Sequence, residues 1–125
     1  MGIRRYSSIS VETTLATGIS AGDTTVSVAT GTGAALVQGS GFTNGDQFTI
    51  AIDPDTNNEE IVFVTARTSD TLTVTRGRAG STAVSHSAGA TVQHVLTSDD
   101  LDYFNNAIQS SVALPGTPTI NGGTP

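Results

Sequence analysis

The sequence predicts a mainly β protein, built as a small antiparallel β-barrel or β-sandwich with one C-terminal α-helix and extended termini. Its 125 residues fit one domain. Threonine, valine, serine and alanine dominate, 14 glycines supply turns, and only 13% of the residues are charged. β-Branched side chains suit a pleated surface, and short alternating segments between turn residues are typical of strands. One stretch near the C-terminus changes to helical spacing.

Residues 1–10 are expected to form an N-terminal arm. Arg4, Arg5 and Tyr6 are followed by two serines, a composition that is typical of a mobile terminus. The alternative is an arm that pairs with a neighbouring subunit, where strand addition would supply main-chain hydrogen bonds. The sequence leaves both open.

A β-domain is expected over residues 11–96, and it begins with two strands. Residues 13–19 are a possible first strand. In residues 24–29 valines alternate with hydroxyl side chains, which is the period of a half-buried strand. Residues 30–46 are loosely patterned, with one short turn of helix expected at 34–37.

An antiparallel meander is the clearest part of the pattern. Its strands are expected at residues 47–52, 61–64 and 71–75, joined by short polar links at 53–58 and 66–70. The middle strand is apolar on both faces, which predicts a central or doubly covered position.

A glycine-rich connection, residues 77–90, leads to the last strand, residues 91–96. Val92 and Val95 fall on different faces of that strand. Its register is therefore weakly specified by the pattern.

A helix is predicted over residues 97–113. Thr97 supplies a capping hydroxyl, and Asp99 and Asp100 place acids in the first turn, where the helix dipole favours them. The apolar stripe is expected to cover an open end of the sheet, with a partner surface as the alternative. Residues 114–125 are expected to be flexible or held by another chain. The stripe consists of Leu101, Phe104, Ile108 and Val112.

Composition argues against several kinds of chemistry. The net charge is −6, and lysine, cysteine and tryptophan are absent. These absences remove a phosphate-loop lysine, a thiolate nucleophile and a cysteine metal site, and they disfavour nucleic-acid binding. No apolar run approaches the ~20 residues that a membrane span needs. We predict no enzyme activity, no cofactor and no metal.

The histidines and the acidic turn also argue against a metal site. His86 and His94 are too few ligands for zinc; His86 is expected to fix its loop by a hydrogen bond, and His94 to lie at a sheet edge or an interface. Residues 53–57 resemble the start of a calcium loop, but Asn58 replaces its glycine and Val64 its closing glutamate.

Two arginines end the third strand of the meander. Arg76 and Arg78 are expected to pair with Asp46 or Asp70, or with another subunit. Nucleic-acid contact is the alternative, disfavoured because aromatic partners for base stacking are missing.

A spaced pattern in residues 71–92 resembles virion proteins of tailed bacteriophages. It runs strand, Arg-Gly, two variable residues, Gly, Thr-Ala, His, Gly and Val. Residues 21–28 and 45–50 resemble the first strands of the same modules, so the resemblance covers about residues 13–96. The residues of the spaced pattern are Arg76, Gly77, Gly80, Thr82, Ala83, His86, Gly89 and Val92.

The resemblance implies a structural protein of the virion. The preferred version is a capsid decoration (cement) protein that binds in many copies, with major capsid, neck or tail proteins and further copies of itself, for example in a trimer, as partners. The longer turn at 53–58 and the lack of a fibre repeat favour a small piece over a full tail fibre. An alternative is a neck, tail or baseplate adaptor that anchors a fibre.

A carbohydrate-binding module is the alternative of another class, with Tyr6 and Tyr103 as the tyrosines available for stacking. Neither nucleic acid nor a membrane is expected as a partner. Residues 1–12 and 113–125 would serve as attachment arms. The residues expected to make interactions are Arg4, Arg5, Tyr6, Arg76, Arg78, His86, Tyr103, Phe104, Ile108, Pro115, Pro118 and Ile120.

Overall fold

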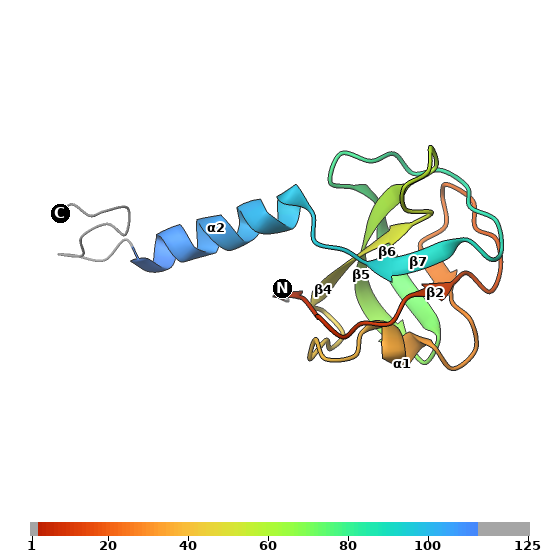
Figure 1. Cartoon of the computed structure of the whole chain (residues 1–125), viewed down its shortest axis with the longest axis horizontal. Coiled ribbons are helices and arrows are strands. Elements are labelled where there is room, and N and C mark those ends of the chain that lie inside the picture. The colour runs from red at the N-terminus through yellow and green to blue at the C-terminus, as the bar shows by residue number, and fades with distance from the viewer. Residues whose placement is uncertain (1–2, 113–125) are drawn as a thin grey trace.

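A curled antiparallel sheet forms the body of the molecule, and one long helix projects from it (Figure 1). The computed structural model describes residues 3–112, and from residue 107 onward it describes the backbone only. The curled sheet and the C-terminal helix confirm the predicted mainly β fold class.

Seven strands form one sheet in the order β2-β7-β4-β5-β6-β3, and β1 adds to β4 in parallel. The predicted meander is confirmed as β4, β5 and β6, although β5 is longer than its apolar run. The elements are β1 (Arg4–Arg5), β2 (Thr13–Thr14), β3 (Thr25–Ser27), α1 (Gly33–Leu36), β4 (Gln47–Ile52), β5 (Glu60–Thr68), β6 (Thr71–Arg78), β7 (Thr91–His94) and α2 (Ser98–Val112).

The predicted first strand, residues 13–19, is broken into short pieces because the segment changes its partner twice. Thr13 and Thr14 pair with β7, Leu15 forms a bridge with Val28, and Ile19 forms a bridge with His86. The bridge at Leu15 joins the two end strands of the sheet path, so the curled sheet is held together across its open side.

The core lies inside this curl. Phe48, Ile50 and Ile52 alternate along β4 and are fully buried, as the pattern predicts. Burying a side chain of this size stabilises the fold by about 1.5–3 kcal/mol. The remaining buried core side chains are Leu15, Ile19, Val26, Val28, Leu36, Val37, Val62, Val64, Leu72, Val74 and Val92.

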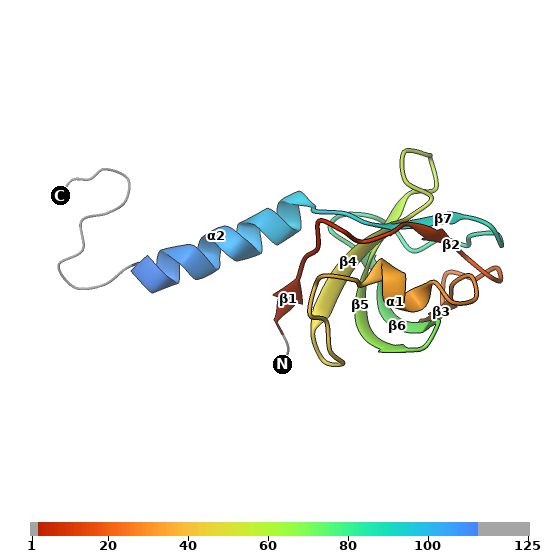
Figure 2. The ribbon, with the colours of Figure 1, turned by 60° about the horizontal axis from the view of Figure 1, so that its bottom comes forward.

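The N-terminal segment from residue 3 to residue 10 lies along its own sheet, in contrast to both expectations for residues 1–10 (Figure 2). The Ile3 carbonyl accepts a hydrogen bond from the Gln47 N–H at 2.9 Å, and Val11 N–H donates to Ala35 at 3.1 Å. The sequence could not show this docking, because two-residue strands carry no periodic pattern.

Gly33→Ala is expected to destabilise the protein by about 1–3 kcal/mol, because small-to-large changes in a packed site force the backbone to move. A Cβ atom at Gly33 would lie 2.2 Å from the Ser69 carbonyl oxygen and 3.0 Å from the Asp70 Cα atom. Thermal unfolding measures the effect. The control is Gly22→Ala, where a Cβ atom would have nothing within 4 Å. Equal melting temperatures for the two variants would contradict this close contact.

Candidate functional site

Glu60 is the centre of a buried polar network. Its side chain is fully buried, and Arg76 binds it with two hydrogen bonds, Nε to Oε2 at 2.7 Å and Nη2 to Oε1 at 2.8 Å. The backbone N–H groups of Gly77 and Val84 also donate to this carboxylate, at 2.9 and 3.2 Å. Burial alone would raise the pKa of Glu60, but the hydrogen bonds from Arg76, His86 and the two N–H groups outweigh it and lower the pKa to about 2.

His86 lies between two carboxylates. Its Nε2 atom lies 2.9 Å from Glu60 Oε1, and its Nδ1 atom lies 2.8 Å from Asp53 Oδ2. Its backbone exchanges both hydrogen bonds with Ile19, at 3.0 and 2.9 Å. The imidazole therefore ties its glycine-rich loop to the β4–β5 turn and to the start of β5, which confirms its predicted role of fixing the loop.

Arg76 extends the same network to the loop before β3 and also binds the glycine-rich loop that holds His86. Its Nη1 donates to the carbonyls of Ser20 and Asp23 at 2.7 and 2.9 Å, and its Nη2 donates to Val84 at 2.6 Å. The prediction that Arg76 pairs with Asp46 or Asp70 is wrong, because its ion-pair partner is Glu60. Sequence spacing could not find Glu60, since the arginine reaches it from the neighbouring strand.

Asp46 and Asp70 have other roles. Asp70 accepts hydrogen bonds from Gly31 and Gly33, both at 2.9 Å, and so joins the β5–β6 turn to α1. Asp46 pairs with Arg5 at 2.8 Å. The hydrogen bonds from Arg5 and from the Thr43 N–H are the main causes that lower the pKa of Asp46 to about 2.

Arg78 makes neither predicted ion pair in the described part of the chain. Its guanidinium lies 5.5 Å from the centroid of the Phe63 ring. This distance is within the range of a cation–π contact.

The buried network around Glu60 joins several loops to the sheet. Each described polar group in it is already paired, and the carboxylate and imidazole at its centre are covered by protein. In residues 3–112, no cluster of histidine and carboxylate side chains suits a metal ion. Such a network can hold the loops that it joins in one arrangement.

A second group of contacts fixes the base of α2. Arg4 lies 3.0 Å from Asp99 and 2.9 Å from Asp100, and its guanidinium is 4.6 Å from the centroid of the Tyr103 ring. The same guanidinium is 5.0 Å from the centroid of the Phe63 ring. Arg4 therefore joins the N-terminal strand to the helix through charge and cation–π contact.

Asp100 is the fully buried member of this group. It accepts a hydrogen bond from Thr49 at 3.0 Å, and its N–H donates to the Thr97 hydroxyl at 3.2 Å. The Thr97 N–H in turn donates to Asp100 at 3.1 Å. This reciprocal cap confirms the predicted helix start.

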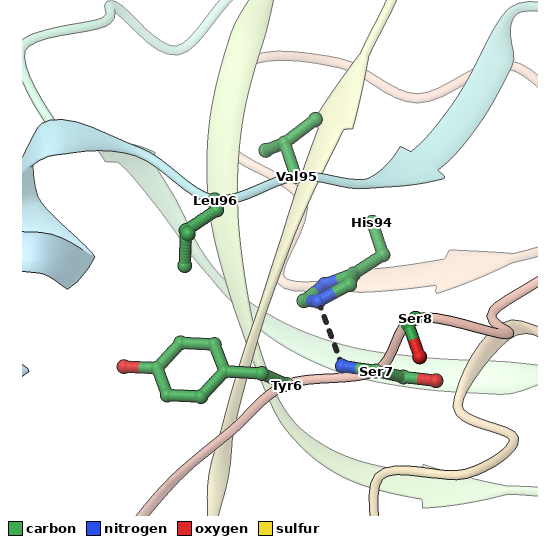
Figure 3. Close-up of a pocket in the computed structure, with 6 residues that line it drawn as sticks. All are labelled: Tyr6, Ser7, Ser8, His94, Val95 and Leu96. Carbon is green, nitrogen blue, oxygen red and sulfur yellow. Dashed lines mark hydrogen bonds between the residues drawn. The ribbon is translucent and has the colours of Figure 1, made fainter.

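His94 ends β7, a strand that lies between β2 and β4. Because β2 pairs only with Thr91 and Val92, the strand pairs with β4 alone at His94, in agreement with the predicted position at a sheet edge. Its ring stacks on Phe48 at 4.1 Å. Its Nδ1–H donates to the Thr49 carbonyl at 2.7 Å, and its Nε2 accepts from the Ser7 N–H at 3.2 Å (Figure 3). A groove of about 430 Å³ runs beside it, between Tyr6 and Leu96.

Acidification from about pH 7 to about pH 5 is expected to destabilise the fold partly through His94. Burial is the main cause that lowers the pKa of His94 below its ordinary 6.5, against the hydrogen bond to Thr49 and the charge of Asp100, which raise it. Below pH 6.5 the unfolded chain therefore binds this proton before the folded chain does, and stability falls. His94→Gln should show a shallower fall of melting temperature over this interval. An equal slope in both proteins would contradict the assignment.

The base of α2 carries an exposed apolar surface. Leu96, Leu101, Tyr103 and Phe104 are 57%, 48%, 43% and 53% exposed. An apolar cavity of about 290 Å³ lies here, lined by Tyr6, Leu96, Asp100, Leu101 and Phe104. The prediction that the stripe covers the sheet is wrong for Leu101 and Phe104, because the helix points away from the sheet (Figures 1 and 2).

The remaining predicted residues are only partly described. Tyr6 packs beside the helix, where burial raises the pKa of its hydroxyl. Ile108 lies on α2, but its side chain is not described. Pro115, Pro118 and Ile120, like the whole tail of residues 114–125, lie outside the described residues.

A scan against models of protein families finds no match for this chain, and a search of curated proteins finds none either. Among the described residues, no helix is both long and apolar enough to cross a membrane.

Proposed function

We propose that this chain is a structural protein that acts by shape and adhesion, without an atom-transferring centre. The observation that carries the proposal is the projecting helix, on which Leu101 and Phe104 remain about half exposed. Contiguous exposed apolar side chains are typical of a surface that binds another protein. The acidic first turn of the helix is anchored to the domain, so the surface is held in a fixed direction.

The buried network supports the same proposal. Arg76, Gly77 and His86 belong to the pattern that resembles phage virion proteins, and all three bind Glu60. The spacing of these residues therefore has a structural explanation, because their side chains and backbone hold several loops against the Glu60 carboxylate. A rigid scaffold of this kind suits a component of a particle.

The particular role that we propose is that of a virion protein of a tailed phage, preferably a capsid decoration protein bound in many copies. A neck, tail or baseplate adaptor that anchors a fibre is the other version in the same class. Both versions require the exposed surface of α2 to be covered in the assembled particle. They differ in which neighbour covers it.

The test is the composition of purified phage particles from a lysate of the organism that encodes the chain. Mass spectrometry should find the chain in the particles, in an amount comparable with other structural proteins. A cryo-electron microscopy map of those particles would then place it on the head or on the neck and tail. Absence from the particles, or specific binding on a glycan array by the free protein, would overturn the proposal.

A further inference from the structure

Three adjacent hollows lie in a row between the N-terminal segment and β7, and Figure 3 shows the middle one. The middle groove, of about 430 Å³, shares Ser7 and His94 with a polar pocket of about 350 Å³ that extends to Glu12. In the other direction it shares Tyr6 and Leu96 with the apolar cavity of about 290 Å³ at the base of α2. Together the three hollows form the β7 groove, which is polar at one end and apolar at the other.

One side of the β7 groove is an open piece of strand edge. The Val95 N–H donates to the Thr49 carbonyl of β4 at 3.2 Å. Successive residues of an antiparallel strand direct their main-chain groups to opposite sides, so those of His94 face away from β4. β2, the neighbour on that side, pairs only with Thr91 and Val92. Within the described residues the His94 main chain has no hydrogen bond to the N-terminal segment, and the edge is therefore open to an added strand.

The apolar end of the groove has room for a large side chain. Leu96, Leu101 and Phe104 line the hollow there and remain about half exposed. Tyr6 lines it too, and its buried hydroxyl has no hydrogen-bond partner among the described residues. Leaving such a group unpaired costs stability. An occupant of the hollow would cover the apolar side chains and bring a polar group to this hydroxyl.

The groove is acidic at both ends. Glu12 lines the polar end and is exposed. At the apolar end α2 begins with Asp99, Asp100 and Asp102. Arg4 binds the first two of these carboxylates, which leaves the exposed Asp102 as a net negative charge. Charge complementarity therefore favours an occupant that carries arginine or lysine.

The chain itself contains no free segment of that kind. Residues 113–125 include neither arginine nor lysine. The five basic residues of the chain all lie in paired strands of the sheet. The occupant that fits the charge is therefore a segment of another protein. The basic residues are Arg4, Arg5, Arg67, Arg76 and Arg78.

We propose that the β7 groove binds an extended basic segment of another protein, which adds as a strand to the open edge at His94. The segment places a large apolar side chain in the hollow at the base of α2 and pairs an arginine or lysine with Asp102. The inference rests on the proposed function, since it gives the chemistry of the partner that covers the exposed surface of α2.

Fluorescence anisotropy with two labelled synthetic peptides tests the chemistry of the occupant. In the first peptide an arginine and a leucine precede alternating threonine and valine, and the second has the reverse order, so that both directions along β7 are sampled. One of them is expected to bind the full chain with a Kd below about 1 mM. The control peptides carry glutamate in place of arginine and should bind about tenfold more weakly. Equal binding of the arginine and glutamate peptides, or no binding by either arginine peptide, would overturn the inference.

Variants of the full chain locate the binding. Phe104→Ser is expected to weaken binding of the arginine peptide about tenfold, whereas Asn106→Ser, at an exposed helix position that does not line the hollow, should not. Asp102→Asn should weaken it several-fold, and Glu59→Gln, which removes the same charge from an exposed turn, should leave it unchanged. Equal effects within either pair would place the peptide elsewhere and overturn the inference. Circular dichroism shows that each variant remains folded.

Amide hydrogen exchange tests strand addition. With the peptide at saturation, exchange of the His94 N–H is expected to slow about tenfold or more, because the added strand accepts its hydrogen bond. The Val95 N–H is the internal control, since it is already bonded to Thr49 and should change little. Unchanged exchange at His94 in the bound state would contradict strand addition.

Failure of this inference can be told apart from failure of the proposed function. If the chain occurs in purified particles but neither arginine peptide binds it, the inference fails and the proposed function stands. If the peptide binds in the β7 groove but the chain is absent from particles, the groove keeps its assigned ligand and the proposed function fails.

Discussion

Glu60→Gln is expected to lower the free energy of unfolding by about 3–5 kcal/mol, because it removes one charge from a buried ion pair and leaves Arg76 uncompensated. The amide nitrogen also replaces one of the two accepting oxygens, so it places a donor against either the Gly77 N–H or the Val84 N–H. For a domain of this size, each kcal/mol corresponds to about 4–8 °C in melting temperature. Thermal and urea unfolding followed by circular dichroism measure the loss.

The matched control is Glu59→Gln at the preceding, exposed position. It makes the same chemical change outside the network, so we expect a change within about 0.5 kcal/mol. A similar small effect of Glu60→Gln would mean that the network contributes little to stability.

The pH dependence of Glu60 follows from its low pKa. The pKa is about 2 in the folded chain, against an ordinary value of 4.5. Its contribution is therefore present above pH 4.5 and is lost as the pH falls from there towards 2. Glu60→Gln should lose less stability than the wild-type protein over this interval.

Asp100→Asn is expected to lower the free energy of unfolding by about 1.5–3 kcal/mol, the range for hydrogen bonds that involve a charged group. The substitution removes a buried negative charge that faces Arg4 and weakens the cap that Asp100 shares with Thr97. We expect α2 to fray at its start as well. Melting temperature and the hydrogen-exchange rates of the first helical turn measure both effects.

Asp102→Asn is the control for this prediction, because Asp102 lies on the same helix and is exposed. It should leave both the melting temperature and the exchange rates nearly unchanged. Fast exchange in the first turn of both variants would show that the helix start depends on general charge and not on the anchor at Asp100.

Local patterns predicted the parts of the fold that depend on neighbouring residues. The alternation in residues 47–52 located β4, and the hydroxyl and acids at Thr97 and Asp100 located the start of α2. Both signals lie within a few residues of the element that they define. The fold class followed from them.

Contacts between distant residues could not be predicted in the same way. Glu60 is the second of two adjacent acids before an apolar run, and its partners Arg76 and His86 are 16 and 26 residues away. Asp46 and Asp70 were equally reasonable partners for an arginine on spacing alone. The periodicity of α2 identified its apolar face. The direction in which α2 leaves the domain decides whether that face meets the sheet, and this direction depends on the contacts of Arg4.

The positions of β1 and β7 have a mechanical consequence. Both strands add to the same edge of β4, β1 at Gln47 and Phe48 and β7 at Ile50 to Ile52. Arg4 ties β1 to the helix, and the chain itself ties β7 to it. A force that pulls on α2 is therefore shared between β1 and β7, which both pair with β4. Such a force acts on a strand inside the sheet and does not first separate one edge strand.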